Sequence, residues 1–485
     1  MGALENIEPK KVFHFFEEIC KIPHGSGNLD RISSCLTTFA QDRGLFHIRD
    51  AHNNVIIVKE ATKGYETIAP IILQGHMDMV AVKKNDCEID LANDPLRLKV
   101  EGDYIYAEGT SLGGDDGIAV AYILAILDSQ DIDHPRIEAV ITTDEEVGMN
   151  GATAIDLSML QAKRMLNIDS EEEGIFLTSC AGGMRVDCHL PIKTVKIPQH
   201  SSCITVKIGG LAGGHSGTEI HKGRANAIKL LAVVLKQALE TSEICIVQIS
   251  GGEKDNAIAR EASAIVCMDS KQTKPFIEKI AAIETEIKNE NKSREKELYI
   301  ECGEVELQVE TMIDRESTQR IVDFLVLLPN GVMAMSADIH GLVETSLNVG
   351  ILRQTPTEVI ASSAIRSAIE TAKYKVKMQV ETLTNRLGGY INSYGEYPGW
   401  QYDPDSKLRA TMVKIYRELF QKDAQVQALH AGLECGIMIA KIPGLDCVSF
   451  GPNIYDIHTT EERLSIASTK RMWEYLLEVL RQKEE

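Results

Sequence analysis

Strand and helix patterns alternate along two separate stretches of this chain, and this rhythm limits the possible folds more than any other feature. Residues 10–180 alternate apolar strand patterns with helix patterns, and the same rhythm returns from Leu408 onward. Such alternation is typical of an α/β layer with a largely parallel sheet. The sequence therefore predicts an α/β domain that the chain leaves and later re-enters.

Between the two stretches, strand patterns alternate with long amphipathic helix patterns, for example at residues 225–239, until a turn-rich segment at 394–400. This section predicts an inserted α+β domain. A chain of 485 residues exceeds what one core usually supports, which agrees with two domains. The predicted boundaries are residues 1–185 and 396–485 for the discontinuous catalytic domain, and 186–395 for the insert.

Composition and charge argue against several classes of protein. The contents of 44% hydrophobic and 25% charged residues are ordinary for a soluble globular protein. No apolar run is as long as a membrane span, and no basic segment followed by an apolar one begins the chain, so we expect neither a membrane anchor nor a signal peptide. The net charge of -20 opposes nucleic-acid binding. The 11 cysteines lack paired spacing and predict reduced thiols in a cytoplasmic protein.

The first candidate site is the run Gly75-His76-Met77-Asp78, which follows the apolar residues 70–73. Residues i and i+2 of a strand share a face, so His76 and Asp78 point to one side at the carboxyl end of a buried strand. An imidazole with a carboxylate beside it, which fixes its tautomer, is a metal-site arrangement. A surface His–Asp pair is the alternative interpretation.

Further candidates follow strand patterns or lie in glycine-rich turns, where a sheet can direct side chains toward one place. Asp115 lies in such a turn, in which the backbone can approach an ion closely. Glu145 and Glu146 follow a strand and point opposite ways, so one can bind metal while the other faces a water. Asp169 ends another strand, and His458 lies in the loop after the last one.

Each of these candidates also has a structural interpretation. Asp115 and Asp116 can form a turn with solvated acids, and Glu145 and Glu146 can begin a helix. Two histidines and three carboxylates, however, make a mixed nitrogen and oxygen set that suits zinc, manganese or cobalt. Their joint occurrence at successive strand ends favours the metal site.

With these residues assembled, the sequence resembles the M20 family of dinuclear metallopeptidases, and most closely its bacterial aminoacyl-histidine (Xaa-His) dipeptidases of the PepD type. The matching segments span nearly the whole chain in the order of the family. One departure is Gly-Asp-Asp-Gly at residues 114–117, where several relatives have Ala-Asp-Asn-Gly. The segments are residues 73–80, 109–117, 144–149, 167–174, 212–217, 430–436 and the loop around His458.

The resemblance implies two bound divalent ions, with Zn²⁺ as the first expectation and Mn²⁺ or Co²⁺ as alternatives. It also implies that a water between the ions attacks the peptide carbonyl, and that a glutamate accepts its proton. The implied roles are Asp115 as the bridging ligand, His76 and Asp169 as ligands of one ion, Glu146 and His458 as ligands of the other, Asp78 as the residue that orients His76, and Glu145 as the general base.

For the insert, the resemblance implies a lid and a dimerisation platform in a homodimer. His215 would help to hold the oxyanion of the intermediate, and a loop histidine beside Ser216 is the alternative. For Arg366 a structural salt bridge is the alternative to substrate binding. The residues implied as substrate anchors are Asn256, Arg366, Gly432 and Glu434.

The predicted function is that of a cytoplasmic metallo-dipeptidase that hydrolyses unblocked dipeptides, preferentially Xaa-His types including β-alanyl-histidine. An N-acyl-amino-acid deacylase or a carboxypeptidase of the same family is the first alternative. A mononuclear enzyme is a second. A non-catalytic binding protein that kept the fold is a third, which we disfavour because neither a ligand nor the base is missing.

Overall fold

The chain folds into two units in the computed structural model, which describes residues 2–306 and 309–483. Unit 1 comprises Met1–Ser179, Tyr402–Ala428 and Leu433–Glu485, and unit 2 comprises Cys180–Gln401 and Leu429–Gly432. The predicted boundaries at residues 185 and 396 fall a few residues inside unit 2. The short return of Leu429–Gly432 to unit 2 was not expected from the sequence.

The eight-stranded sheet of unit 1 is parallel at its centre and antiparallel toward its edges. Its order is β1 (Phe46–Arg49), β2 (Val55–Lys59), β6 (Ile137–Thr142), β3 (Ile71–His76), β7 (Arg164–Asn167), β21 (Asp446–Ser449), β8 (Ile175–Cys180) and β20 (Gln425–Leu429). β3 runs parallel to β6 and β7, and β7 runs parallel to β21. The strands β3 and β6 are continuous buried runs, as expected for parallel strands covered on both faces.

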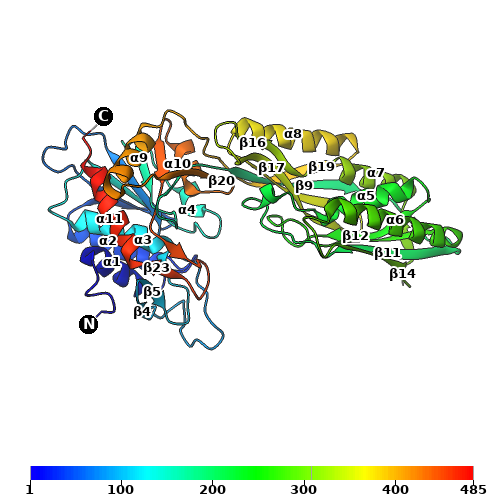
Figure 1. Cartoon of the computed structure of the whole chain (residues 1–485), viewed down its shortest axis with the longest axis horizontal. Coiled ribbons are helices and arrows are strands. Elements are labelled where there is room, and N and C mark those ends of the chain that lie inside the picture. The colour runs from blue at the N-terminus through cyan, green and yellow to red at the C-terminus, as the bar shows by residue number, and fades with distance from the viewer. Residues whose placement is uncertain (1, 307–308, 484–485) are drawn as a thin grey trace. The chain divides into compact units, whose positions relative to one another are not determined.

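Helices cover both faces of this sheet. Leu73 on one face of β3 belongs to the main core cluster of unit 1, whereas Gln74 on the other face contacts Glu434 at the start of α10. Helix α3 is buried along Ile118–Leu127 because it packs between α1 and β3. The helices of unit 1 are α1 (Lys10–Cys20), α2 (Asp30–Asp42), α3 (Gly114–Asp128), α4 (Asn150–Ala154), α9 (Lys407–Phe420), α10 (Glu434–Lys441) and α11 (Ile466–Arg481) (Figure 1). A small sheet contains β4 (Leu98–Glu101), β5 (Tyr104–Ala107), β22 (Ile454–Tyr455) and β23 (Arg463–Ser465).

Unit 2 is built on a nine-stranded antiparallel sheet with helices packed against it (Figure 1). Its strands are β14 (Tyr299–Glu304), β11 (Ser201–Gly209), β13 (Ala262–Asp269), β12 (Cys245–Gly251), β17 (Val343–Gln354), β18 (Glu358–Ser367), β9 (Gly182–Pro191) and β19 (Tyr390–Tyr397), with β16 (Gly331–Met335) beside β17. The helices are α5 (Ala227–Leu239), α6 (Thr273–Asn291), α7 (Arg315–Leu327) and α8 (Glu370–Arg386). The remaining elements are the strands β10 (Thr194–Lys196) and β15 (Thr311–Ile313) and the 3₁₀ turns η1 (Ile220–Lys222) and η2 (Ser270–Gln272).

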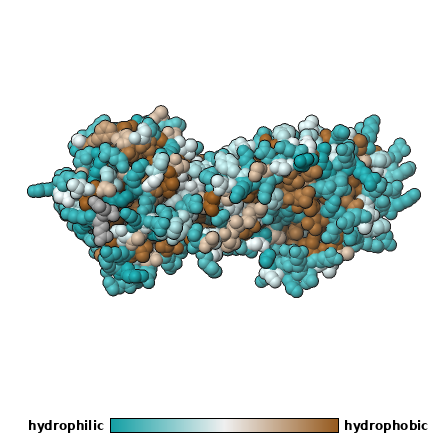
Figure 2. Space-filling view, turned by 90° about the horizontal axis from the view of Figure 1, so that it is seen from above, coloured by the Kyte–Doolittle hydropathy of each residue, from teal (hydrophilic) through white to brown (hydrophobic). Residues whose placement is uncertain are grey.

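The predicted fold class, an α/β unit with an inserted α+β unit, is confirmed. Figure 2 shows hydrophilic side chains over much of the visible face, with apolar areas between them. Within residues 2–306 and 309–483, no helix combines the length and apolar character that a membrane span requires.

One cysteine pair differs from the expectation of reduced thiols. Cys203 of β11 and Cys267 of β13 lie directly opposite each other, with Cα atoms 4.3 Å apart, and form a disulfide. The two residues are 64 positions apart in the sequence, and only strand pairing makes them neighbours. The expectation was therefore wrong for this pair, whereas nine other cysteines are free thiols.

Candidate metal centre

The four central strands of the unit 1 sheet all lead into predicted site residues at their carboxyl ends. His76 ends β3, Glu145 and Glu146 follow β6, and Asp169 follows β7. β21 leads into the loop that carries His458. Because these strands run parallel, their carboxyl ends meet at one edge of the sheet, where side chains from separate strands converge.

His76 is buried within this group, with 1% of its surface exposed. Its Nε2 lies 3.2 Å from Oδ1 of Asp115 and 3.4 Å from Oδ1 of Asp169. Its Nδ1 lies 2.9 Å from the backbone oxygen of Asp78 and donates a hydrogen bond to it. In the neutral ring this bond leaves the Nε2 lone pair directed at the two carboxylates, which is the orientation of a metal ligand.

Asp115 connects the two predicted ligand groups through its two oxygens. Oδ1 faces His76, whereas Oδ2 lies 3.2 Å from Nε2 of His458. The same nitrogen of His458 lies 2.8 Å from Oε1 of Glu146. One carboxylate therefore contacts both histidines, each from a different oxygen.

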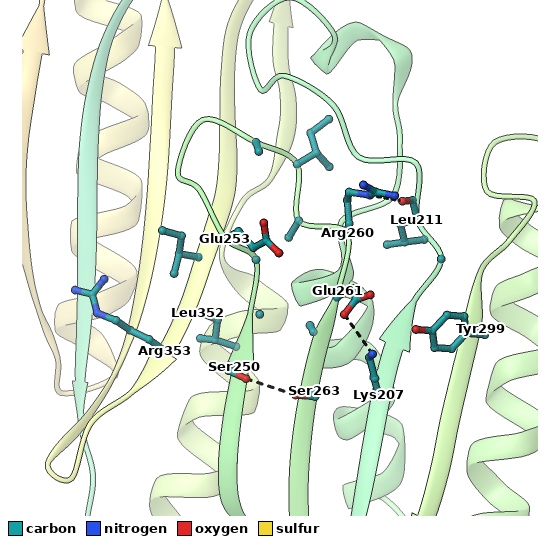
Figure 3. A pocket seen from close by; sticks show the side chains of 18 residues that line it. Lys207, Leu211, Ser250, Glu253, Arg260, Glu261, Ser263, Tyr299, Leu352 and Arg353 are labelled. Carbon is teal, nitrogen blue, oxygen red and sulfur yellow. Dashed lines mark hydrogen bonds and ion pairs between the residues drawn. The ribbon is translucent and has the colours of Figure 1, made fainter. Parts of the chain in front are cut away.

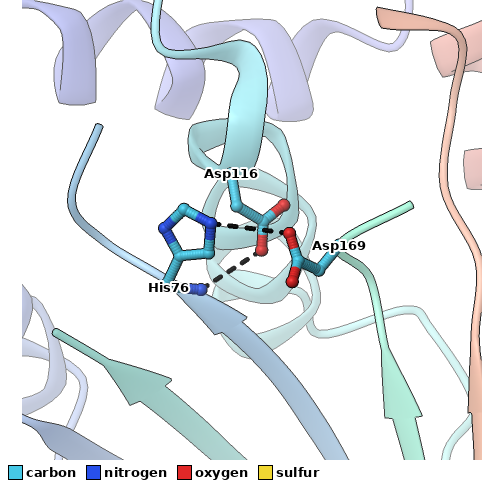
Figure 4. Close-up of side chains that lie close together, drawn as sticks. All are labelled: His76, Asp116 and Asp169. Carbon is cyan, nitrogen blue, oxygen red and sulfur yellow. Dashed lines mark hydrogen bonds and ion pairs between the residues drawn. The ribbon is translucent and has the colours of Figure 1, made fainter. Parts of the chain in front are cut away.

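Asp116 also belongs to this site, although the sequence reasoning left it without a role. One ligand atom from each of His76, Asp116 and Asp169 lies within 4.8 Å of the other two, and Figure 4 shows the three side chains together. Oδ2 of Asp116 accepts a hydrogen bond of 3.2 Å from the backbone N–H of His76. Burial raises the pKa of Asp116 well above its usual range, and Asp169 adds to the increase. The Asp116 carboxyl thus links the start of α3 to the end of β3.

The buried carboxylate of Asp78 holds the turn that follows β6. Oδ1 accepts the backbone N–H of Glu145 at 3.1 Å, and Oδ2 accepts the Ser26 hydroxyl at 2.8 Å and the N–H of Glu146 at 3.4 Å. Oδ1 also lies 3.5 Å from Nδ1 of His76. Burial acts to raise the pKa of Asp78, but His76, Ser26 and Glu145 outweigh it and lower the pKa.

Glu145 lies close to several other acids. One of its oxygens lies within 4.8 Å of ligand atoms of His76 and Glu146. Burial raises the pKa of Glu145 to about 9, and the negative charges of Asp169, Glu434 and Glu146 contribute to the increase. The carboxyl is therefore protonated at neutral pH in the metal-free protein, whereas a nearby cation would favour its ionised form.

The surrounding carboxylates raise the pKa of both histidines. Burial lowers the pKa of His76, but Asp115, Asp169 and Asp78 outweigh it and raise the pKa well above its usual value. Hydrogen bonds with Asp115 and Glu146 raise the pKa of His458 to about 10. Without metal, protons therefore supply the positive charge that this set of acids stabilises.

Glu434 belongs to unit 1 and forms hydrogen bonds with side chains of the sheet strands β3 and β6. Its Oε2 accepts from Nε2 of Gln74 at 2.5 Å and from the Thr142 hydroxyl at 2.6 Å. Burial raises the pKa of Glu434 to about 7. Its other oxygen, Oε1, has no hydrogen-bond partner among the residues that the structure describes.

His215 belongs to unit 2, and its surroundings fix the tautomer of its ring. Nδ1 accepts the backbone N–H groups of Gly217 at 3.3 Å and Thr218 at 3.1 Å. Burial lowers the pKa of His215, and the positive charge of Arg366 adds to the decrease. The neutral ring therefore carries its proton on Nε2, where it can act as a hydrogen-bond donor.

Arg366 and His430 lie next to His215 in unit 2. A Cβ atom on Gly217 would lie 3.0 Å from Cε1 of His215, 3.2 Å from Nε of Arg366 and 2.4 Å from the backbone oxygen of His430. Arg366 is 6% exposed and donates from Nη1 to the Tyr397 hydroxyl at 2.9 Å. Its Nε has no hydrogen-bond partner, and no salt bridge of Arg366 occurs, within the described part of the chain.

The other predicted anchors of unit 2 lie near these residues. The backbone oxygen of Asn256 accepts the N–H of Ser216 at 2.8 Å, which places Asn256 beside the His215 segment. Gly432 ends the short segment of unit 2 that contains His430. Nε2 of His430 lies 2.8 Å from the Ser346 hydroxyl, and burial together with Arg366 lowers the pKa of His430 to about 3.

A cavity of about 690 Å³ in unit 2 is lined by none of the predicted site residues. Figure 3 shows side chains of both charges around it, including the ion pair of Lys207 and Glu261 at 3.3 Å. Arg260 donates to the backbone oxygen of Leu211 in the same region. The converging ligand atoms of unit 1 lie outside this cavity.

The residues of unit 1 fit a metal centre in their donor chemistry. Two imidazole nitrogens and several carboxylate oxygens form the mixed set that zinc, manganese and cobalt accept. Three overlapping groups of such residues have ligand atoms within 4.8 Å of one another. These groups are His76, Asp116 and Asp169; His76, Glu145 and Glu146; and Asp115, Glu146 and His458.

Sequence reasoning missed three residues that contact this site: Ser26, Asp116 and Glu462. Ser26 donates a hydrogen bond to Asp78. Glu462 accepts hydrogen bonds from the turn before Asp115. Both contacts join distant parts of the chain, and no local pattern indicates them. The sequence did point to Asp116, because it adjoins Asp115. Which partner each of the two acids faces, however, depends on the backbone conformation of the turn.

Comparisons with known proteins agree with this geometry. The cytosol non-specific dipeptidase of Escherichia coli is 35% identical over 99% of both chains. The crystal structure of an aminoacylhistidine dipeptidase from Vibrio alginolyticus matches with a TM-score of 0.94 and 34% identity, over 99% of this chain and 98% of that one. The aminopeptidase PepT of Bacillus cereus shares the fold, with a TM-score of 0.55 and 15% identity over 98% of both chains. The model of peptidase family M20/M25/M40 matches residues 72–482, and the chain therefore belongs to this family of peptidases.

Proposed function

We propose that the protein is a dinuclear metallo-dipeptidase that hydrolyses unblocked dipeptides, preferentially Xaa-His types including β-alanyl-histidine. The observation that carries the proposal is the position of Asp115, whose two oxygens each lie 3.2 Å from a different histidine. A carboxylate in this position suits the bridge between two ions. Membership in a peptidase family and the full-length similarity to two dipeptidases support the reaction class.

In this proposal, two divalent ions would be held, with Zn²⁺ as the first expectation. His76 and Asp169 would hold one ion, Glu146 and His458 would hold the other, and Asp115 would be shared by both. Asp116 is assigned no ion, because its Oδ2 already accepts the backbone N–H of His76. Mn²⁺ and Co²⁺ suit the same donors.

Bound divalent ions would lower the pKa of the attacking water and polarise the peptide carbonyl. Glu145 accepts a proton from this water while the water oxygen attacks the carbonyl carbon. Glu145 then delivers the proton to the leaving amine nitrogen. Asp78 keeps Glu145 in place through the backbone N–H of Glu145 and also lies beside His76. His215, which carries its proton on Nε2, donates to the oxyanion in this proposal.

Substrate anchoring is assigned to Asn256, Arg366, Gly432 and Glu434. Arg366 has the strongest support, since a buried guanidinium without a described carboxylate partner suits the carboxylate of a dipeptide. The salt bridge considered from the sequence is not found in the described residues. Unit 2 is proposed as the lid and as the dimerisation platform of a homodimer, and sedimentation analysis of the purified protein tests the second role.

Cytoplasmic localisation is part of the proposal, and the similarity to an enzyme named as cytosolic supports it. Disulfides are uncommon in that compartment, and the disulfide between Cys203 and Cys267 is an exception. Alkylation of thiols at lysis, followed by mass spectrometry of the two peptides, measures how much of this pair is oxidised in the cell.

A hydrolysis panel on metal-reconstituted protein tests the reaction. β-Alanyl-histidine and other unblocked dipeptides should be cleaved, and their N-acetylated forms should be cleaved at least tenfold more slowly. Equal cleavage of blocked and free forms would instead support the deacylase or carboxypeptidase alternative. Metal analysis of the active protein separates the two-ion proposal from a mononuclear enzyme.

A further inference from the structure

Glu462 is a buried acid that neither the ligand set nor the proposed reaction uses. It is 3% exposed and lies four residues after His458 in the sequence. Its carboxylate points at the turn that precedes Asp115. A buried carboxylate requires hydrogen-bond donors that compensate for its lost contact with water.

Both oxygens of Glu462 accept backbone N–H groups from this turn. Oε2 accepts from Leu112 at 2.8 Å and from Gly113 at 3.1 Å. Oε1 accepts from Gly114 at 2.8 Å and from Asp115 at 3.4 Å. Leu112 and Gly113 precede α3, and Asp115 has backbone angles that are not helical, so these N–H groups belong to a turn and not to the regular part of the helix. Glu462, which lies far away in the sequence, supplies the acceptor for all four.

The turn is also packed closely against Met79. Gly113 has a φ of 69°, in the left-handed region, and a Cβ there would lie 2.8 Å from Sδ of Met79. Met79 therefore limits movement of the turn where Gly113 faces it. Glu462 holds the backbone of the turn through its N–H groups. The bonded N–H of Asp115 fixes the backbone from which the shared carboxylate extends.

We propose that Glu462 is a positioning residue that holds the carboxylate of Asp115 between His76 and His458. The proposal rests on the two-metal site proposed above. The loop that carries His458 also carries Glu462, so one short segment sets both a ligand and the backbone of the bridging residue. Metal–ligand distances are set within about 0.2 Å, and small movements of Asp115 therefore weaken binding.

The replacement Glu462→Gln tests the proposal because it keeps the size of the side chain. The amide offers only one acceptor oxygen to the turn. Its NH₂ group cannot accept hydrogen bonds from the N–H groups that it faces. We expect the affinity for the second of two Zn²⁺ or Co²⁺ ions to fall about 10- to 100-fold. We also expect kcat to fall by a similar factor with little change in KM, and the absorption spectrum of the Co²⁺ protein to change.

Glu138 offers a matched control. It is also buried, with 0% of its surface exposed, and accepts the backbone N–H groups of Gln161 and Ala162 at 3.0–3.1 Å, beside Arg136. It lies near the start of β6, about 13 Å along the strand from Thr142 at the site end. Glu138→Gln should therefore lower the melting temperature without changing metal affinity per folded molecule.

The outcomes separate this proposal from the proposed function. If wild-type protein does not bind two ions, the two-metal function fails. If wild type and Glu462→Gln bind two ions equally well and give the same Co²⁺ spectrum, Glu462 has only a structural role and the positioning proposal is overturned. Glu462→Asp, which keeps the charge but is one methylene shorter, serves as the second variant. Failure of both variants to fold, judged by circular dichroism, would assign Glu462 to folding and also overturn the proposal.

Discussion

Single side chains decide the chemistry of this site, and Glu145 is the first to test. Replacement by Gln removes the proton acceptor but keeps the size of the side chain. We expect kcat for a dipeptide to fall by about 10²- to 10⁴-fold, because this is the usual contribution of a general base. Metal content should stay within experimental error of wild type.

Glu172→Gln is the matched control for this prediction. Glu172 is an exposed acid three residues after Asp169, and no role is assigned to it. Its replacement should leave kcat unchanged. A Glu145→Gln variant with wild-type turnover would show that another group accepts the proton.

The pKa values of the histidines predict how metal binding depends on pH. In the metal-free protein His76 and His458 are protonated at pH 7, since the pKa of His458 is about 10 and that of His76 is also raised. Metal must displace these protons, and it also favours the ionised form of Glu145, whose pKa is about 9 without metal. Affinity should therefore rise with pH over the range 6–8, and binding at pH 7 should release on the order of three protons. Titration calorimetry in buffers of different ionisation enthalpy measures this number.

His458→Ala should release about one proton fewer than wild type in the same titrations. A binding enthalpy that is independent of the buffer would contradict the prediction. The raised pKa of His458 also stabilises the metal-free fold below pH 6.5, and this stabilisation is lost as the pH rises through about 10.

The positions of helices and strands followed well from local patterns. The patterns at residues 137–143 and 164–168 predict strands that the structure places at Ile137–Thr142 and Arg164–Asn167. Apolar residues indicate these elements directly, because strands covered on both faces are mostly apolar. The antiparallel edges of the unit 1 sheet could not be predicted in the same way, since strand direction depends on the path of the connections.

The contact between β3 and α3 gives a prediction at the scale of elements. A Cβ on Gly75 would lie 2.5 Å from Oδ2 of Asp116 and 2.7 Å from Cβ of Ala119. Gly75→Ala should therefore push β3 and α3 apart, lower the free energy of unfolding by about 1–3 kcal/mol and weaken metal binding. Denaturant unfolding and metal titration measure the two effects.

Gly303→Ala serves as the control for Gly75→Ala, because a Cβ on Gly303, in a strand of unit 2, would meet no atom within 4 Å. It should leave metal affinity unchanged. Wild-type metal affinity and stability in Gly75→Ala would show that the close approach of β3 to α3 does not support the site.

The division into two units predicts where metal stabilises the molecule. All proposed ligands belong to unit 1. A ligand that binds only the folded state stabilises it by about 2.7 kcal/mol at 100 times its dissociation constant. Adding Zn²⁺ to metal-free protein should therefore slow amide hydrogen exchange in β3, β7 and the start of α3. Exchange in the sheet of unit 2, for example in β11 and β13, should not change in substrate-free protein, and equal slowing in both units would contradict the assignment.

The sequence by itself determined the α/β rhythm, the insert and the residues at the ends of the central strands, because apolar periodicity and short polar runs are local properties. Only the tertiary structure decided that the two oxygens of Asp115 face different histidines. It alone brought Glu462 to the turn before Asp115, and Cys203 to Cys267. These contacts join segments far apart in the chain, and the packing of elements against one another, which no local pattern records, selects them.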